Sequence, residues 1–218
     1  MTKYMKEELH CKVYVVEIDK KSYSHAIQFA AGGFCGDIEA GKWYEQFKEL
    51  RFDYILFADV LEHLKQPETT LTLAKELLKD QGEVIISIPN ICHPDIISNL
   101  YLNRFQYTNI GLLDNTHIHF WGKENLKSLA NESGYEIRLL DGVYQNIGCT
   151  EQHIDLNKLP EHFRNALMKR EYNDVYQFFL VLNKKEWFRE NKYTMEERLK
   201  NSVEALAVNI YWDMGEGY

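Results

Sequence analysis

A strand, a helix and a second strand follow one another within residues 52–90, and this pattern constrains the fold more than any other part of the chain. The apolar run at residues 54–58 is typical of a buried parallel strand, and residues 84–88 form a second, β-branched run of the same kind. Between these runs, leucine and alanine recur at helical spacing over residues 67–78. Such a unit predicts two parallel strands joined by a crossover helix, with a ligand crevice at the carboxyl ends of the strands.

The rest of the chain continues this alternation. Its apolar patterns predict helices at residues 3–10, 20–31, 42–50 and 123–133, and strands at residues 12–18, 33–38, 135–140 and 175–182. Gly32 and Gly33 are expected to end the second of these helices. Strands that alternate with helices of this length favour an α/β, doubly wound and mostly parallel sheet.

A length of 218 residues suits one domain with an appendage. We expect the α/β domain to cover residues 1–185 and the appendage to cover residues 186–218. Helical spacing of apolar residues over 195–211 predicts a helix in the appendage, and Thr194 with Glu197 matches a capping box at its start. This helix is expected either to pack on the domain or to pair with a second copy of the chain in a homodimer.

Residues 91–121 interrupt the alternation and carry several aromatic and asparagine side chains. Because they follow a predicted strand at the ligand end of the sheet, one interpretation is an insertion that acts as a lid over a substrate. The other interpretation is a solvated connector whose aromatic side chains contact the core. The sequence leaves both open.

The composition excludes several classes of function. A net charge of −8 and a pI near 5.5 argue against nucleic-acid binding, which needs a basic surface. No apolar run approaches the roughly 20 residues that span a bilayer, and the first residues do not resemble a secretion signal. The expected location is the cytoplasm.

The sequence predicts no metal site. The four cysteines form no C-x-x-C pair, so free thiols are expected. His117 and His119 would share a face on an extended segment, but no carboxylate or thiol follows them at ligand spacing.

Several segments in order resemble class I S-adenosylmethionine-dependent methyltransferases, in particular the branch that modifies small molecules and sugars. These segments are KVYVVEID from residue 12, GDIE from residue 36, FADVLEHL from residue 57, LLKDQGEVIISIPN from residue 77 and DNTHIHFWGKENLKSLANESGYEI from residue 114. The resemblance implies an antiparallel last strand, S-adenosylmethionine as cofactor, and methyl transfer to an oxygen or nitrogen of a small-molecule acceptor.

One part of the family's pattern is not found at the start of the chain. The family begins with a strand and a glycine-rich G-x-G-x-G loop, whereas residues 1–9 have a helical pattern. The first strand, which is central in the family's sheet, is therefore expected to be missing. This favours an alternative function as a catalytically weak or inactive binding or assembly module. A nicotinamide-dependent dehydrogenase is a third possibility, against which the D-V-L-E-H segment argues.

The resemblance assigns cofactor-binding roles to residues at three strand ends. Glu17 would bind the ribose hydroxyls and Ile18 would flank the adenine ring, while Asp37 would meet the adenine amino group and Ile38 would cover the ring. The cofactor's methionine side would lie against residues 58–60. These last residues are Ala58, Asp59 and Val60.

Two histidines are the candidates for catalysis. His63 follows the D-V-L-E segment and can act as a base toward an acceptor hydroxyl, because imidazole titrates near neutrality. His117 lies after the insertion and is expected to face the acceptor. Structural roles, in which each ring bonds to nearby backbone, are the alternative for both.

Overall fold

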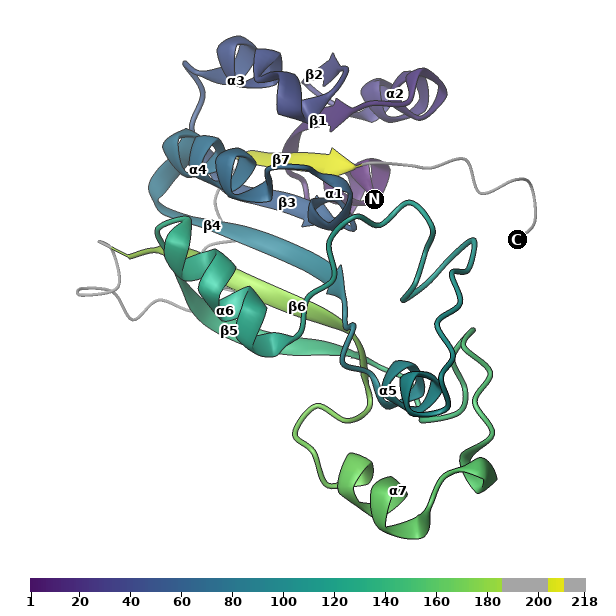
Figure 1. Ribbon diagram of the computed structural model, residues 1–218. Helices are drawn as coiled ribbons and strands as arrows, with labels where there is room; N and C mark the ends of the chain where they lie inside the picture. The colour runs from purple at the N-terminus through teal and green to yellow at the C-terminus, as the bar shows by residue number, and fades with distance from the viewer. Residues whose placement is uncertain (186–203, 210–218) are drawn as a thin grey trace.

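The computed structural model describes residues 1–185 and 204–209, and within these residues the chain forms a seven-stranded sheet (Figure 1). Across the sheet the strands are β2 (Gly32–Cys35), β1 (Lys12–Glu17), β7 (Glu204–Asn209), β3 (Phe52–Ala58), β4 (Leu78–Pro89), β6 (Val175–Lys184) and β5 (Tyr135–Tyr144). The first five strands in this order run parallel, and β6 is antiparallel to both β4 and β5. The predicted doubly wound, mostly parallel α/β fold is confirmed, and the strand expected at residues 175–182 is antiparallel as β6, although the parallel strand β7 follows it in the sequence.

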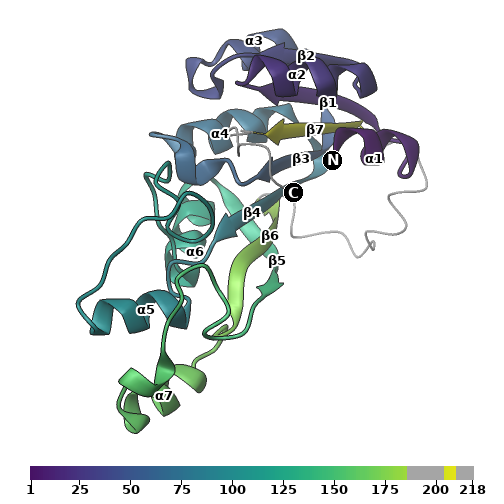
Figure 2. The ribbon, with the colours of Figure 1, turned by 90° about the vertical axis from the view of Figure 1, so that its right-hand side faces the viewer.

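Helices cover both faces of the sheet. They are α1 (Thr2–Glu7), α2 (Lys20–Ala26), α3 (Lys42–Phe47), α4 (Pro67–Leu77), α5 (Pro94–Tyr101), α6 (Lys123–Glu132) and α7 (Glu161–Met168), with 3-10 turns η1 (Ile27–Phe29), η2 (Ile38–Ala40), η3 (Leu61–His63) and η4 (Leu156–Lys158). Figures 1 and 2 show α4 and α6 on one face and α1 on the opposite face. No helix in the described part of the chain is long and apolar enough to cross a membrane.

β7 occupies the central position of the sheet. The first residues of the sequence lead us to expect that the strand at this position is missing. It pairs in parallel with β1 on one side and with β3 on the other. Residues 205–208 are buried on both faces, since Ala205 and Ala207 pack with Met5 of α1 while Leu206 and Val208 join the core beneath α4. The last part of the sequence therefore supplies the strand that the first part lacks.

The prediction of a helix over residues 195–211 is therefore wrong for residues 204–209, which form β7. That segment is extended because both of its edges pair with strands, and an apolar run of this length suits a buried strand as well as a helix. The homodimer expected through this helix has no support from residues 204–209, and the rest of the appendage (186–203 and 210–218) lies outside the described residues.

Gly32 and Gly33 form β2, so the prediction that they end a helix is wrong. The helix ends earlier, since α2 stops at Ala26 and one 3-10 turn follows. Glycine is needed at position 33 because a Cβ atom there would lie 2.9 Å from the carbonyl oxygen of Val15 and 2.7 Å from its Cγ1 atom.

We expect Gly33→Ala to lower the free energy of unfolding by about 1–3 kcal/mol, because the added methyl group would crowd Val15 and Tyr23. Gly32→Ala is the matched control, since its Cβ atom would meet only the Tyr14 ring at 3.2 Å, a side chain that can shift. Urea denaturation of the two variants measures the difference. Equal unfolding free energies would contradict the steric argument.

Candidate functional site

The carboxyl ends of five parallel strands align in one row. Glu17 pairs with Cys35 of β2 on one side and with Asn209 of β7 on the other, Asn209 pairs with Ala58 of β3, and Ala58 pairs with Ser87 of β4. The five strands therefore end at the same edge of the sheet. Parallel α/β sheets bind their ligands at this edge.

Glu17 lies between Cys35 and Asn209 in this row and is fixed by the turn that follows it. The residue is 2 % exposed, and its Oε1 atom accepts a hydrogen bond of 2.9 Å from the backbone N–H of Asp19. Asp19 in turn caps α2 by accepting from the N–H of Ser22 at 2.7 Å, and this bond lowers the pKa of Asp19. The turn holds the Glu17 carboxylate at the strand end, while Ile18 is 45 % exposed beside it.

Asp37 and Ile38 lie just beyond β2 and have well-defined local roles. The Asp37 carboxylate accepts a 2.8 Å hydrogen bond from the N–H of Glu39 and so caps η2. Ile38 is 4 % exposed, and its carbonyl oxygen accepts from the indole N–H of Trp43 at 2.7 Å. Both residues line an open cleft of about 290 Å³ between η2 and the start of α4, where Gln66 also lies. Within the described residues, Glu17 and Asp59 do not line this cleft.

Asp59 turns the chain at the end of β3. Its backbone has a φ of +53°, a left-handed conformation that aspartate tolerates better than most residues. Its Oδ1 atom accepts hydrogen bonds from Ser87 Oγ at 3.2 Å and from the Gln177 amide. The residue is exposed, but the protein around the carboxylate desolvates it and raises its pKa. Ala58 before it is half-buried, and Val60 after it is fully buried.

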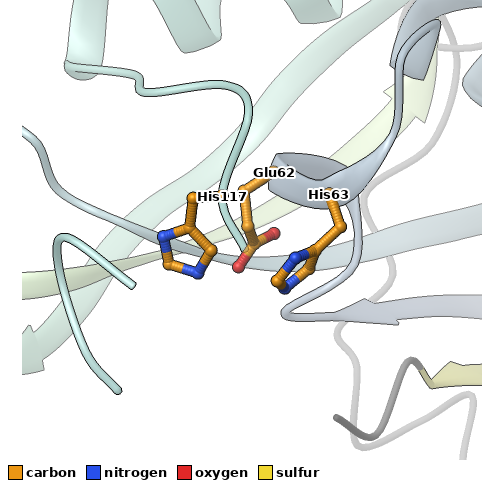
Figure 3. Close-up of side chains that lie close together, drawn as sticks. All are labelled: Glu62, His63 and His117. Atoms are coloured by element: carbon orange, nitrogen blue, oxygen red, sulfur yellow. The ribbon is translucent and has the colours of Figure 1, made fainter. Parts of the chain in front are cut away.

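Three side chains from two distant segments meet beside this turn. Glu62 and His63 come from η3, His117 comes from the end of the insertion, and one ligand-type atom of each lies within 4.8 Å of the others. Figure 3 shows the Glu62 carboxylate between the two imidazole rings, whose centroids are 4.9 Å apart. The two catalytic candidates are thus neighbours, and His119 is directed elsewhere, with its ring stacked on Trp121.

Hydrogen bonds hold these two segments together. The carbonyl oxygen of Glu62 accepts from the N–H groups of Ile118 and His119 at 2.9 and 3.1 Å. His63 Nδ1 lies 3.2 Å from the carbonyl oxygen of Thr116, which fixes the tautomer with the proton on Nδ1 because a carbonyl can only accept. Asp114 shapes the loop by accepting from the Thr116 N–H and hydroxyl at 2.8 and 2.6 Å.

Burial sets the protonation of the cluster. Glu62 is 1 % exposed, and desolvation together with the nearby charge of Asp59 raises the pKa of its carboxyl well above the usual range. Burial lowers the pKa of His63, and burial with the neighbouring His63 lowers the pKa of His117 to about 4. Both rings are therefore neutral at physiological pH.

Sequence reasoning misses several residues of this region. It assigns no role to Glu62 beside His63, and Ser87 and Gln177 bond to Asp59 from strands that carry no motif. Sequence reasoning also assigns no role to the D-M-G-E-G sequence at residues 213–217, which comes after β7 and lies outside the described residues. A signal for this segment is visible in the sequence, since an apolar run followed by G-x-G is the pattern that the family carries near its N-terminus.

Comparisons with known proteins agree with this geometry. A family model described as a methyltransferase domain matches residues 1–140, and no curated protein matches the chain. Among solved structures, an S-adenosylmethionine-dependent methyltransferase of Thermotoga maritima, described as a possible histamine N-methyltransferase, is similar with 16% identity, a TM-score of 0.52, and coverage of 84% of this chain and 78% of that one. A methyltransferase of Anabaena variabilis has 17% identity and a TM-score of 0.49, with 80% and 68% covered.

The structural likeness supports the fold, and the family model, which covers more than half of the chain, supports the family. The strand-end row also fits the cofactor, because a buried carboxylate at the end of β1 suits a ribose diol. The chain belongs to the family of methyltransferase domains, enzymes whose methyl donor is S-adenosylmethionine.

Proposed function

We propose that this protein transfers a methyl group from S-adenosylmethionine to an oxygen or nitrogen atom of a small-molecule acceptor. One observation carries this proposal: Glu17 and Ala58 align in one strand-end row, and two histidines lie beside the turn that follows β3. The cofactor supplies a methyl group on a positively charged sulfur, which an acceptor atom attacks in line. The protein's part is to align the two reactants and to exclude water.

In this proposal the nucleoside part lies along the amino-terminal half of the row. Glu17 binds the ribose hydroxyls through its carboxylate, and Ile18, which is exposed at the edge, packs against adenine. Asp37 would reach the adenine amino group with the carboxylate oxygen that does not cap η2, and Ile38 would cover the ring. The methionine part lies against Ala58, Asp59 and Val60, where the chain turns away from β3.

The acceptor would lie on the side of His63 and His117. A neutral imidazole can accept the proton of an acceptor hydroxyl, or it can bind a cation that lowers the pKa of that hydroxyl. Residues 91–121, whose last part bonds to the carbonyl oxygen of Glu62, would cover the acceptor as a lid. The net charge of −8 favours a small acceptor over a nucleic acid.

Glu17→Ala should weaken the binding of S-adenosylhomocysteine by about 1–3 kcal/mol, because hydrogen bonds from the ribose to a charged carboxylate are lost. Isothermal titration calorimetry of the full chain measures this change. Glu45→Ala is the matched control, since the Glu45 side chain is 68% exposed on α3 and pairs only with Lys48 within the described residues.

Equal affinities of the Glu17→Ala and Glu45→Ala proteins would remove Glu17 from the cofactor site. Undetectable binding of S-adenosylhomocysteine by the unaltered chain would instead favour the alternative function, a binding or assembly module with the same fold. That alternative rests on a missing central strand, and β7 weakens it by occupying that position.

A further inference from the structure

We propose that Glu62, His63 and His117 bind a divalent transition-metal ion at the acceptor side of the methyl-transfer site. The role of the ion in methyl transfer rests on the proposed function, but the binding of the ion by these side chains does not. Two imidazoles and one carboxylate are a ligand set that proteins use for catalytic zinc and for non-haem iron, with further positions open to water or substrate.

The first argument is the state of the Glu62 carboxylate. The residue is only 1 % exposed. Both oxygen atoms of its carboxylate are buried and have no hydrogen-bond partner among the described residues. A buried carboxylate without a partner is destabilising, and proteins avoid this by pairing it or by placing it on a metal. Figure 3 shows the carboxylate directed between His63 and His117.

The second argument is the electrostatic environment. The charges that act most strongly on Glu62 come from Asp59 and Asp114, and both are negative. A divalent cation placed here would have the Glu62 carboxyl group and two imidazole rings as ligands, with the acidic side chains of Asp59 and Asp114 near it.

The third argument is that the ligands are already held near one another. The hydrogen bond from His63 Nδ1 to Thr116 leaves the lone pair of this ring on Nε2, and backbone bonds fix residues 118 and 119 to the carbonyl oxygen of Glu62. A bond from the other ring nitrogen to a carbonyl oxygen is how proteins orient metal-binding histidines. Metal–ligand distances of about 2.1 Å place the ligand atoms roughly 3–4 Å from one another. The three ligand atoms here lie within 4.8 Å of one another, so the side chains would move by about an ångström to bind the ion.

The ion would explain what the cluster contributes to methyl transfer. An acceptor hydroxyl next to the ion loses its proton to solvent more readily, and its oxygen then attacks the methyl carbon. The new O–CH₃ bond forms as the S–CH₃ bond breaks, the bonding pair stays on sulfur, and S-adenosylhomocysteine leaves. This points to acceptors that present an ionisable hydroxyl, preferably with a second oxygen that can also reach the ion.

The test is a Co²⁺ titration of the full chain, purified without a histidine tag and treated with a chelator. We expect one ion per chain, followed by visible absorption bands of Co²⁺ and by displacement with Zn²⁺ in calorimetry. Glu62→Gln, His63→Gln and His117→Gln should each weaken binding at least tenfold. His119→Gln is the matched control and should leave the affinity unchanged, because its ring stacks on Trp121 outside the cluster.

Circular dichroism of each variant separates loss of the site from loss of the fold. Absence of saturable binding by the unaltered chain would overturn the proposal, and so would equal weakening by His119→Gln and His117→Gln. Neither methyl donor nor acceptor is present in this titration. A negative result would therefore leave the Glu17 experiment, and with it the proposed methyl transfer, standing.

Discussion

A chain that ends after Val203 will lose cooperative folding, because β7 is the strand that joins the two halves of the sheet. Without residues 204–209, β1 and β3 would face each other across an unfilled position, with the edges of both strands unpaired. The burial of Leu206 and Val208 contributes about 1.5–3 kcal/mol for each side chain. The backbone hydrogen bonds on both edges add about 1 kcal/mol each. These terms together are comparable to the roughly 5–15 kcal/mol that stabilises a typical domain.

The measurement is thermal and urea unfolding followed by circular dichroism and tryptophan fluorescence. A chain that ends after Asn209 is the control, because it keeps β7 and lacks only residues 210–218. We expect this control to unfold in one transition, and the shorter chain to show a broad, weakly cooperative change. A sharp transition with an unchanged urea dependence in the shorter chain would show that β7 is dispensable.

Much of this fold is predictable from local patterns. The unit within residues 52–90 predicts β3, α4 and β4 because each element has its own apolar period and clear ends. The antiparallel pairing of β6 is implied by family resemblance rather than by the pattern of its residues. Periodicity identifies an element, but it does not say which strand will lie beside it.

β7 is not predictable in this way, for a physical reason. Residues 204–209 contain glutamate, alanine and leucine, which favour helices, and only Val208 favours a strand. The segment is extended because β1 and β3 offer two open edges, and these pairings join residues about 190 and about 150 positions apart in the sequence. Tertiary pairing thus overrides local preference here.

The candidate site shows the same limit. The strand pattern is enough to place Glu17 and Asp59 at the ends of parallel strands, whereas their proposed roles come from the family resemblance. The meeting of Glu62 with His117 depends on how the insertion returns to η3, which the sequence does not encode in any short motif. The sequence pairs His117 with His119, its neighbour in the chain, whereas the fold pairs it with Glu62 and His63.

The second large effect concerns the residues after β7. Asn209 lies in the strand-end row between Glu17 and Ala58, so β7 ends at the centre of the proposed cofactor site. The sequence that follows contains D-M-G-E-G at residues 213–217. A glycine-rich segment after the central strand is where this family brings its backbone close to the cofactor, since glycine allows an approach that a side chain would block.

We therefore expect the chain that ends after Asn209 to fold and yet to bind S-adenosylhomocysteine at least tenfold more weakly, a loss of about 1.4 kcal/mol or more. Gly215→Val and Gly217→Val in the full chain should have the same effect, whereas Glu216→Ala, which keeps both glycines, should not. Calorimetry measures the affinities, and unfolding curves verify that the variants are folded. If all these proteins bind with equal affinity, the last nine residues take no part in the site, and the cofactor must be held by the described strand ends alone.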